Sequence, residues 1–157
     1  MKMNENFFIS KAIDPLPYET KWEAPSNIAL IKYWGKKNLQ IPKNPSLSFT
    51  LDKSVTRTSI RFEPSESGKF KFKFFFNGSL KPDFDDKLHV FFDRIKKYVC
   101  WITNYELTIK SINTFPHSSG IASSASAMAA LSLAIMDLEC YLFNFEKNDF
   151  FFTKVWV

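Results

Sequence analysis

One stretch of the sequence combines residue types that suit the binding of an anion. Residues 113–134, NTFPHSSGIASSASAMAALSLA, place serines and one glycine directly before an alanine-rich apolar run. A loop that bends at Pro116 and Gly120 and enters a helix at Ser123 or Ser124 presents several unpaired backbone N–H groups in one direction. The helix N-terminus adds about half a unit of positive charge. Gly120 allows close approach of an oxygen, and serine hydroxyls can donate to phosphate or ligate hydrated magnesium.

A purely structural role explains the same stretch without a ligand. Ser123 or Ser124 can serve as an N-cap, and small residues let the helix pack tightly. The spacing of the stretch is neither that of the Walker lysine loop nor that of the dinucleotide fingerprint. Residue types alone therefore leave both readings open.

A second stretch, KWEAPSNIALIKYW at residues 21–34, is apolar with interruptions at Pro25 and Asn27. It predicts a strand that ends at a site, followed by the polar loop GKKNLQIPKNPS. Lys32 follows this strand. A lysine in that position is, by itself, more often a solvated surface charge than a functional group.

Alternating and helical patterns predict the elements that position these residues. Residues 1–20 predict an extended arm, and residues 47–62 predict two short strands joined around Asp52 and Lys53. Phenylalanines alternate with lysines in KFKFKFFFNGS, which predicts a strand that ends in a turn at Asn77 and Gly78. The apolar members are Phe70, Phe72, Phe74 and Phe76, and the basic ones are Lys69, Lys71 and Lys73.

The second half of the chain predicts helix, strand, loop and helix. Asp83 is the expected cap of a helix whose apolar positions are Leu88, Phe91, Phe92, Ile95, Tyr98 and Val99. NYELTIKSIN predicts a strand with Tyr105, Leu107 and Ile109 on its apolar side, and a helix is expected from about Ser123 to Tyr141. This order indicates an α+β or mixed α/β domain. The last residues, 142–157, form an aromatic tail that a further segment is expected to cover.

Composition restricts the partners and the compartment. The net charge of +5 favours anionic partners such as nucleotides, phosphorylated metabolites, nucleic acid or membrane surfaces. Cys100 and Cys140 have no paired spacing, so we expect two isolated core thiols and neither a disulfide nor a metal site. The N-terminus lacks a secretory signal, and no stretch reaches the roughly 18 apolar residues that span a bilayer, so a cytoplasmic protein is expected.

Two motifs in the chain resemble those of one enzyme family. PHSSGIASSASA resembles the phosphate-binding loop of the GHMP small-molecule kinase superfamily. APSNIALIKYWGKKN and NTFPHSSGIASSAS resemble motifs of the diphosphomevalonate decarboxylases within it. The resemblance covers roughly residues 21–140. It implies an α+β GHMP N-terminal domain over residues 21–141, with a ribosomal-protein-like two-layer arrangement of sheet and helices and without the C-terminal domain.

The resemblance also implies a reaction and its ligands. Members of the family use ATP and Mg²⁺ to phosphorylate 5-diphosphomevalonate, which then loses phosphate and carbon dioxide to give isopentenyl diphosphate for isoprenoid biosynthesis. Asn27 would orient the substrate, and Lys32 would stabilise charge near the reacting hydroxyl. The substrate diphosphate would be held by Tyr33, Trp34, Gly35 and Lys36. The ATP phosphates would be held by Ser118, Ser119, Gly120, Ile121, Ala122, Ser123 and Ser124.

Other residues do not take a role from the resemblance. His117 is read as structural. Lys71 or Lys73 could replace a basic substrate contact of the relatives, but a solvent-facing lysine stripe explains both. The family's Gly-Ser-Gly-Ser-Ala-Cys-Arg-Ser segment and its catalytic aspartate have no counterpart in this sequence, and Asp52, Asp93 and Asp137 lack motif support. The isolated chain is therefore predicted not to turn over.

Three alternatives remain at this point. The chain could be another GHMP kinase, although IKYWGK argues against this. It could be a nucleic-acid-binding module, although its lysines alternate with core phenylalanines rather than gather among exposed aromatics. It could also be an inert truncated product with an exposed core. The favoured reading has small-molecule partners, no nucleic acid or membrane, and a homodimer in the full-length form.

Overall fold

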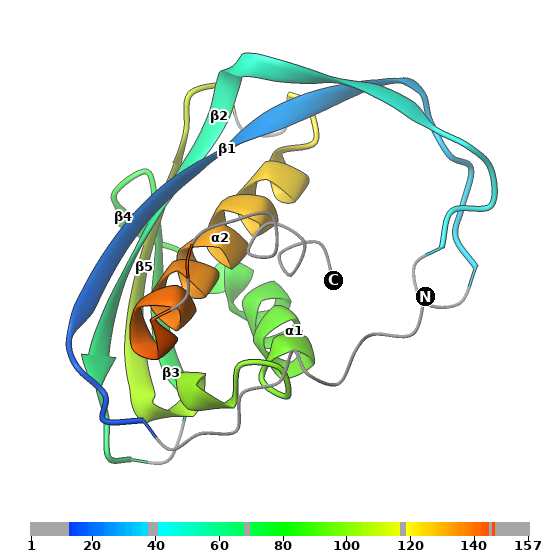
Figure 1. Cartoon of the computed structure of the whole chain (residues 1–157). Coiled ribbons are helices and arrows are strands. Elements are labelled where there is room, and N and C mark those ends of the chain that lie inside the picture. Colours follow the sequence, from blue (N-terminus) through cyan, green and yellow to red (C-terminus); the bar gives the residue numbers. More distant parts are fainter. Residues whose placement is uncertain (1–12, 38–40, 68–69, 117–118, 145, 147–157) are drawn as a thin grey trace.

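The computed structural model describes residues 13–37, 41–67, 70–116, 119–144 and 146. A five-stranded sheet has the order β1-β2-β5-β3-β4, and helices α1 and α2 both lie on one of its faces (Figure 1). The strands are β1 (Tyr18–Ile31), β2 (Leu47–Pro64), β3 (Lys71–Phe76), β4 (Ser79–Leu80) and β5 (Tyr105–Asn113). The helices are α1 (Asp85–Ile95) and α2 (Ser123–Phe143). The predicted α+β or mixed α/β class is confirmed.

The sheet is mixed because one connection passes through a helix. β1 pairs with β2 and β2 with β5 in antiparallel fashion, whereas β3 runs parallel to β5. Parallel neighbours need a crossover, which α1 supplies between β3 and β5. α2 packs on β1 and β2, and Phe92 of α1 packs against Phe72 of β3.

Alternation of apolar and polar residues places the core between sheet and helices. Ile60, Phe62, Leu107 and Ile109 are fully buried, and Leu138 of α2 lies in the same cluster. The predicted apolar side of β5 is thus confirmed. On the opposite face of the sheet, charged side chains form exposed ion pairs such as Arg57–Glu23 at 3.0 Å and Lys73–Glu106 at 3.5 Å. Lys71 is also exposed, so the solvent-facing position of Lys71 and Lys73 is confirmed, and Lys69 lies outside the described residues.

Residues 47–64 form one strand, so the prediction of two short strands is wrong. The pairing with β1 nevertheless shifts where the joint was expected, because Pro25 pairs with Val55 and Ser26 with Leu51. Residues 52–54 are therefore left out of the ladder. Pro25 has no N–H to donate, and a bulge opposite it avoids the loss of a ladder hydrogen bond. The first strand also begins earlier than expected, at Tyr18, and ends at Ile31.

Four local predictions can be compared with the structure. The Asn77–Gly78 turn is confirmed, with φ of 49° and 80°. Asp83 is not the helix cap, because Pro82 starts a 3-10 turn over Pro82–Phe84 and α1 begins only at Asp85. Tyr98 and Val99 lie beyond the end of α1. Cys140 is buried as expected, but Cys100 is exposed, so the expectation of two core thiols is wrong for Cys100.

Helix α2 begins at Ser123, as predicted, and ends at Phe143. By length and composition α2 is long and apolar enough to cross a membrane, so the prediction that no segment reaches this length is wrong. Of the 18-residue apolar segment of α2 that meets this criterion, 56% is buried inside the domain. A core helix meets the same criterion, and the packing of α2 against β1 and β2 explains its apolar composition.

The carboxyl end of β1 and the start of β2 extend beyond the helices. Residues 26–31 of β1 pair with residues 47–51 of β2, and we call this two-stranded extension the ribbon. Figure 1 shows the ribbon passing over the N-terminal end of α2 and arching away from it. Both sequence motifs therefore lie at the same end of the domain.

Candidate phosphate-binding site

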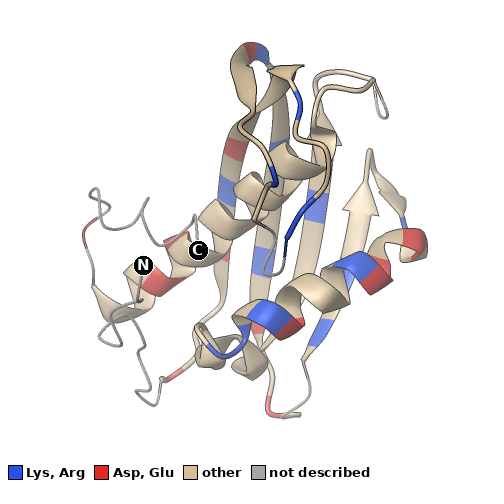
Figure 2. Ribbon diagram, turned by 90° about the vertical axis from the view of Figure 1, so that its right-hand side faces the viewer, with Lys and Arg blue, Asp and Glu red and all other residues tan. Residues whose placement is uncertain are grey.

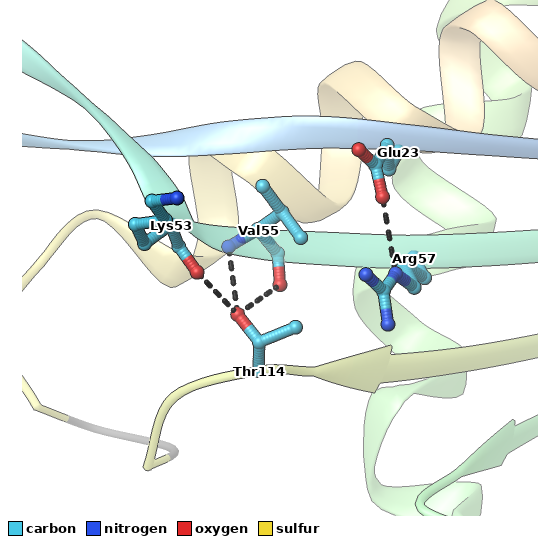
Figure 3. Close-up of polar contacts among 5 residues, drawn as sticks. All are labelled: Glu23, Lys53, Val55, Arg57 and Thr114. Atoms are coloured by element: carbon cyan, nitrogen blue, oxygen red, sulfur yellow. Dashed lines mark hydrogen bonds and ion pairs between the residues drawn. The ribbon is translucent and has the colours of Figure 1, made fainter.

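The serine loop starts from a threonine that is fastened to β2. The Thr114 N–H donates to the Val55 carbonyl at 3.0 Å, and the Val55 N–H donates to Thr114 Oγ1 at 2.9 Å. Thr114 Oγ1 also lies 3.0 Å from the Lys53 carbonyl oxygen (Figure 3). The loop thus leaves the sheet beside the irregular segment 52–54 of β2.

Buried hydroxyl groups fix the first turn of α2 to the sheet. Thr56 Oγ1 donates to Asn113 Oδ1 at 2.9 Å and lies 2.7 Å from Ser126 Oγ. Ser126 Oγ is in turn 3.1 Å from the Ser123 carbonyl oxygen. Thr56 and Ser126 are 0% and 2% exposed, so these bonds form away from water, where an unpaired hydroxyl would be costly. We call Thr56, Asn113, Ser123 and Ser126 the hydroxyl network.

The end of the loop is attached to β1. The Ser26 hydroxyl donates to the Ile121 carbonyl, which joins the start of the ribbon to the residue before the helix cap. Gly120 and Ala122 both have positive φ, 79° and 42°. Ala122 occupies the N-cap position, and its carbonyl accepts hydrogen bonds from Ala125 at 2.9 Å and Ser126 at 3.2 Å.

The cap arrangement corrects one expectation and supports another. Neither Ser123 nor Ser124 caps the helix, because the left-handed Ala122 holds that position without a side-chain bond and both serines lie inside the first turn. Within the described part of the chain, the backbone N–H groups of residues 119–124 donate to no protein acceptor. A helix N-terminus with free N–H groups is suited to bind an anion.

The loop residues differ in how accessible they are. Ser119, Gly120 and Ser124 are exposed, whereas Ile121, Ala122 and Ser123 are half-buried. Ser118 and His117 lie outside the described residues. The Ser124 hydroxyl is thus the more accessible of the two helical serine hydroxyls that were expected to contact phosphate.

The second motif forms a loop that is braced by an asparagine. Asn44 Oδ1 accepts the Trp34 N–H at 2.7 Å, and Asn44 Nδ2 donates to the carbonyls of Lys32 at 3.3 Å and Pro45 at 2.8 Å. Gly35 adopts φ of 99°, and its carbonyl accepts the Lys43 N–H at 3.1 Å. Asn44 is not among the predicted site residues, although Asn-Pro in a polar loop is a signal for a turn.

The side chains of this loop are basic and aromatic. Lys32 is exposed, Trp34 is 85% exposed and Tyr33 is 40% exposed. Lys36 Nζ lies 5.7 Å from the centre of the Tyr33 ring, at the outer range of a cation–π contact. Figure 2 shows the lysine positions of this loop on the side of the molecule that faces the viewer. Such a loop could hold an anionic group by charge and by its backbone N–H groups.

The structure brings the two motifs together at Ser26, the residue before Asn27. Asn27 is half-buried, and strand alternation places it on the opposite face of β1 from Ser26. Lys32 follows the ribbon, ~20 Å along the extended backbone from Ser26. Lys32 and Trp34 make no hydrogen bond to residues 119–124 in the part of the structure that is described. Ser26, Thr56 and Ser126 were missed by sequence reasoning because their partners are distant in the chain.

The aspartates lie in three different surroundings. Asp93 is exposed, and a hydrogen bond from Lys96 at 2.7 Å together with its charge lowers the pKa of Asp93. Asp52 is exposed in the irregular segment of β2. Asp137 is buried in α2 and accepts hydrogen bonds from Thr20 Oγ1 at 2.5 Å and Trp22 Nε1 at 3.0 Å. These contacts fasten β1 to α2 and explain why an acid lies on the buried side of an apolar helix.

No group of three or more His, Cys, Asp or Glu side chains suitable for a metal occurs among the described residues. A Mg²⁺ ion at the serine loop would therefore take its ligands from phosphate oxygens, water and serine hydroxyls. Such a donor set is common where Mg²⁺ is bound together with a nucleotide. The exposed hydroxyl of Ser124 fits this role.

Comparison with known proteins gives a consistent result. The family model described as the diphosphomevalonate decarboxylase-like N-terminal domain matches residues 24–149. A diphosphomevalonate decarboxylase of Candida albicans is 36% identical over 132 residues, which cover 77% of this chain and 36% of that protein. The chain thus spans about a third of the length of this curated relative.

Solved structures of similar fold carry related descriptions. One is described as the mevalonate diphosphate mediated ATP binding mechanism of the mevalonate diphosphate decarboxylase from Enterococcus faecalis. It has a TM-score of 0.64 and 36% identity, over 76% of this chain and 37% of that one. A second, described as MDDEF in complex with MVAPP, AMPPCP and magnesium, has a TM-score of 0.63 and 36% identity, over 76% and 36% of the two chains.

Proposed function

Since the chain belongs to the diphosphomevalonate decarboxylase-like N-terminal domain family, we propose that it forms the phosphate-binding part of a diphosphomevalonate decarboxylase. The reaction of that enzyme is the ATP-dependent phosphorylation and decarboxylation of 5-diphosphomevalonate to isopentenyl diphosphate. One observation carries the proposal: the N–H groups of residues 119–124 have no protein acceptor in the described structure, at the end of a helix that is firmly anchored.

The serine loop is the proposed site for the phosphates of ATP with Mg²⁺. The positive end of α2 stabilises negative charge, and the buried hydroxyl network together with Ser26 holds the N–H groups in place before the ligand arrives. Pre-positioned donors lose less conformational freedom on binding than mobile ones do. The solved relatives described with ATP, AMPPCP and magnesium support this assignment.

The loop that follows the ribbon is the proposed site for the substrate diphosphate. Tyr33, Trp34, Gly35 and Lys36 would hold it, with Lys32 placed to stabilise charge and Asn27 to orient the substrate. The exposed lysines and the brace from Asn44 to the Trp34 N–H support this role. The solved relative described in complex with MVAPP shows that a relative binds such a molecule.

Turnover requires groups that the family carries in its Gly-Ser-Gly-Ser-Ala-Cys-Arg-Ser segment and in its catalytic aspartate. Since no motif in residues 1–157 matches that segment or the surroundings of that aspartate, we propose that this chain alone binds ligands but does not release carbon dioxide. The homodimer, the absence of nucleic-acid and membrane partners, and the cytoplasmic location stay predictions.

Isothermal titration of the purified chain with Mg-ATP tests the proposal. Ser124→Ala removes one hydroxyl at the proposed phosphate site, and a hydrogen bond to a charged group contributes about 1.5–3 kcal/mol, so affinity should fall by about tenfold to 100-fold. Ser79→Ala, an exposed serine on β4, is the matched control and should bind like the wild type. Absence of Mg-ATP binding by folded wild-type chain, or equal affinities for both variants, would refute the assignment.

A further inference from the structure

The serine loop is attached at both of its ends to one short region of the β1–β2 pair. The start of the loop is held at Thr114, which bonds to Lys53 and Val55 of β2. The end of the loop is held by the hydrogen bond that the Ser26 hydroxyl donates to the Ile121 carbonyl. Both attachments lie where the register of the β1–β2 pairing shifts. The course of the loop therefore depends on this irregularity as well as on helix α2.

The irregularity leaves a short segment of β2 outside the ladder. Pro25 pairs with Val55 and Ser26 with Leu51, so residues 52–54 have no register partner on β1. Extra residues in one strand of a pair bend that strand locally. Backbone groups that a ladder leaves out need other partners, and these partners then decide how the irregular segment is held.

Thr114 supplies such a partner through its hydroxyl group (Figure 3). Thr114 Oγ1 accepts the Val55 N–H at 2.9 Å and donates to the Lys53 carbonyl at 3.0 Å. The Thr114 N–H donates to the Val55 carbonyl at 3.0 Å, as in a regular antiparallel pair. In such a pair the two residues exchange both backbone hydrogen bonds, so the Thr114 carbonyl would normally accept the Val55 N–H. Here the Thr114 hydroxyl accepts it, and the backbone is free to leave the sheet at this residue.

A hydroxyl group suits this position because it accepts and donates at the same time. Valine has nearly the same shape as threonine but can do neither. The Thr114 side chain is exposed, so water can replace both of its hydrogen bonds and the sheet should form without them. The effect of the hydroxyl group is therefore expected in the direction of the loop rather than in the stability of the domain.

We propose that Thr114 is a positioning residue for the phosphate site. Its hydroxyl group fixes the point at which the serine loop leaves the sheet, and so fixes where the N–H groups of residues 119–124 lie. The Ser26–Ile121 hydrogen bond holds the end of the loop, and a loop that is held at one end keeps more conformational freedom than a loop that is held at both. Thr114 itself does not contact the ligand. The inference rests on the proposed function only for the identity of that ligand, Mg-ATP.

Isothermal titration of the purified chain with Mg-ATP tests the role of the hydroxyl group. Thr114→Val should weaken binding by about tenfold, because donors that are held less firmly must be ordered when the ligand binds. Thr114→Ser keeps the hydroxyl group and should restore the affinity of the wild type. Thr103→Val is the matched control, because the Thr103 hydroxyl also donates to a backbone carbonyl, that of Cys100 at 3.0 Å, but lies at the opposite end of β5. This control should bind as the wild type does, and its melting temperature should change about as little as that of Thr114→Val.

A second measurement needs no ligand. NMR relaxation of the nucleotide-free chain gives backbone order parameters, which are about 0.85 for a rigid backbone and below about 0.6 for a flexible one. At residues 119–124 the order parameters should be lower in Thr114→Val than in the wild type, whereas Thr114→Ser and Thr103→Val should keep the wild-type values.

Several results would overturn the role of Thr114. They are wild-type order parameters in Thr114→Val, wild-type affinity of Thr114→Val for Mg-ATP, and an equal loss of affinity in Thr114→Ser or Thr103→Val. If the folded wild-type chain does not bind Mg-ATP, the proposed function fails and the order parameters alone decide the role of Thr114. A decrease confined to Thr114→Val then supports that role, and no decrease overturns it. The two proposals therefore fail on different observations.

Discussion

Replacing Thr56 with valine tests whether the hydroxyl network holds the start of α2 in place. Valine has nearly the same shape as threonine, so the substitution removes the hydroxyl and leaves the packing volume almost unchanged. Thr56 is 0% exposed, and its hydroxyl contacts Asn113 Oδ1 at 2.9 Å and Ser126 Oγ at 2.7 Å. The substitution therefore removes two buried hydrogen bonds at the base of the serine loop.

The size of the effect follows from those two bonds. A buried hydrogen bond contributes about 1 kcal/mol net, so Thr56→Val should lower the free energy of unfolding by about 2 kcal/mol. For a chain of this size the melting temperature should fall by about 4–8 °C. Because Ser126 Oγ keeps its contact with the Ser123 carbonyl, the helix should still form, but its first turn should be held less firmly.

Urea unfolding followed by tryptophan fluorescence measures the loss. Thr58→Val is the matched control, because Thr58 is also buried, at 4% exposed, but its hydroxyl makes one hydrogen bond among the described residues, with Ser111 Oγ at 3.1 Å. That control should cost about 1 kcal/mol. A double-mutant cycle of Thr56→Val with Ser126→Ala should give a coupling energy of about 1 kcal/mol.

Binding provides the functional readout. Thr56→Val should weaken Mg-ATP binding, whereas Thr58→Val, which lies further along β2 and does not contact α2 through its hydroxyl, should leave it unchanged. The role of the hydroxyl network is contradicted if Thr56→Val is no more destabilising than Thr58→Val, or if the coupling energy lies within about 0.3 kcal/mol of zero.

Three further predictions concern the loops and the core. Asn44→Ala removes the brace of the lysine loop and should weaken binding of inorganic diphosphate by about tenfold, while stability changes by less than about 1 kcal/mol because the site is on the surface. Gly120→Ala and Gly78→Ala should each lower the free energy of unfolding, measured by calorimetry, by about 1 kcal/mol, because φ is 79° and 80° at these positions. No atom lies within 4 Å of either added Cβ, so a steric clash adds nothing to this cost. Only Gly120→Ala should weaken Mg-ATP binding. Burial raises the pKa of Tyr105 above its ordinary 10.0, so the folded state favours the neutral phenol. The free energy of unfolding should therefore fall as the pH rises from 10.0 through the pKa of Tyr105 in the folded state, and it should fall less in Tyr105→Phe. Urea titrations below and above that folded-state pKa measure the difference.

Much of the fold could be predicted because local patterns in the amino-acid sequence specify its strands, turns and helices. The Phe–Lys alternation before Asn77 specifies β3, and the Asn-Gly pair specifies its turn. The change from serine to alanine-rich sequence marks the start of α2 at Ser123. Prediction from local patterns failed where two signals in neighbouring residues favoured different structures. Asp83 is a good cap residue, but Pro82 before it favours a 3-10 turn and delays the helix.

The anchoring of the site could not be predicted, because it depends on contacts between distant residues. Ser26 and Ile121 are 95 positions apart, and Thr56 and Ser126 are 70 apart. Nothing in the spacing of a serine or a threonine within a strand shows which carbonyl or hydroxyl it will meet. The same holds for Asp137. Its place in an apolar helix is explained by the hydrogen bonds that Thr20 and Trp22 donate to its carboxylate, and these two residues are distant in the sequence.

The attachment of β1 to α2 has a consequence for synthesis on the ribosome. Thr20 and Asp137 are 117 residues apart, so the first strand leaves the exit tunnel long before the helix that covers it. At about 5–20 residues per second, the interval lasts between about 6 s and about 23 s. During that interval the nascent strand exposes Trp22 and Ala24 without their cover, so early binding by a chaperone would protect the nascent chain more than faster folding of the isolated strand.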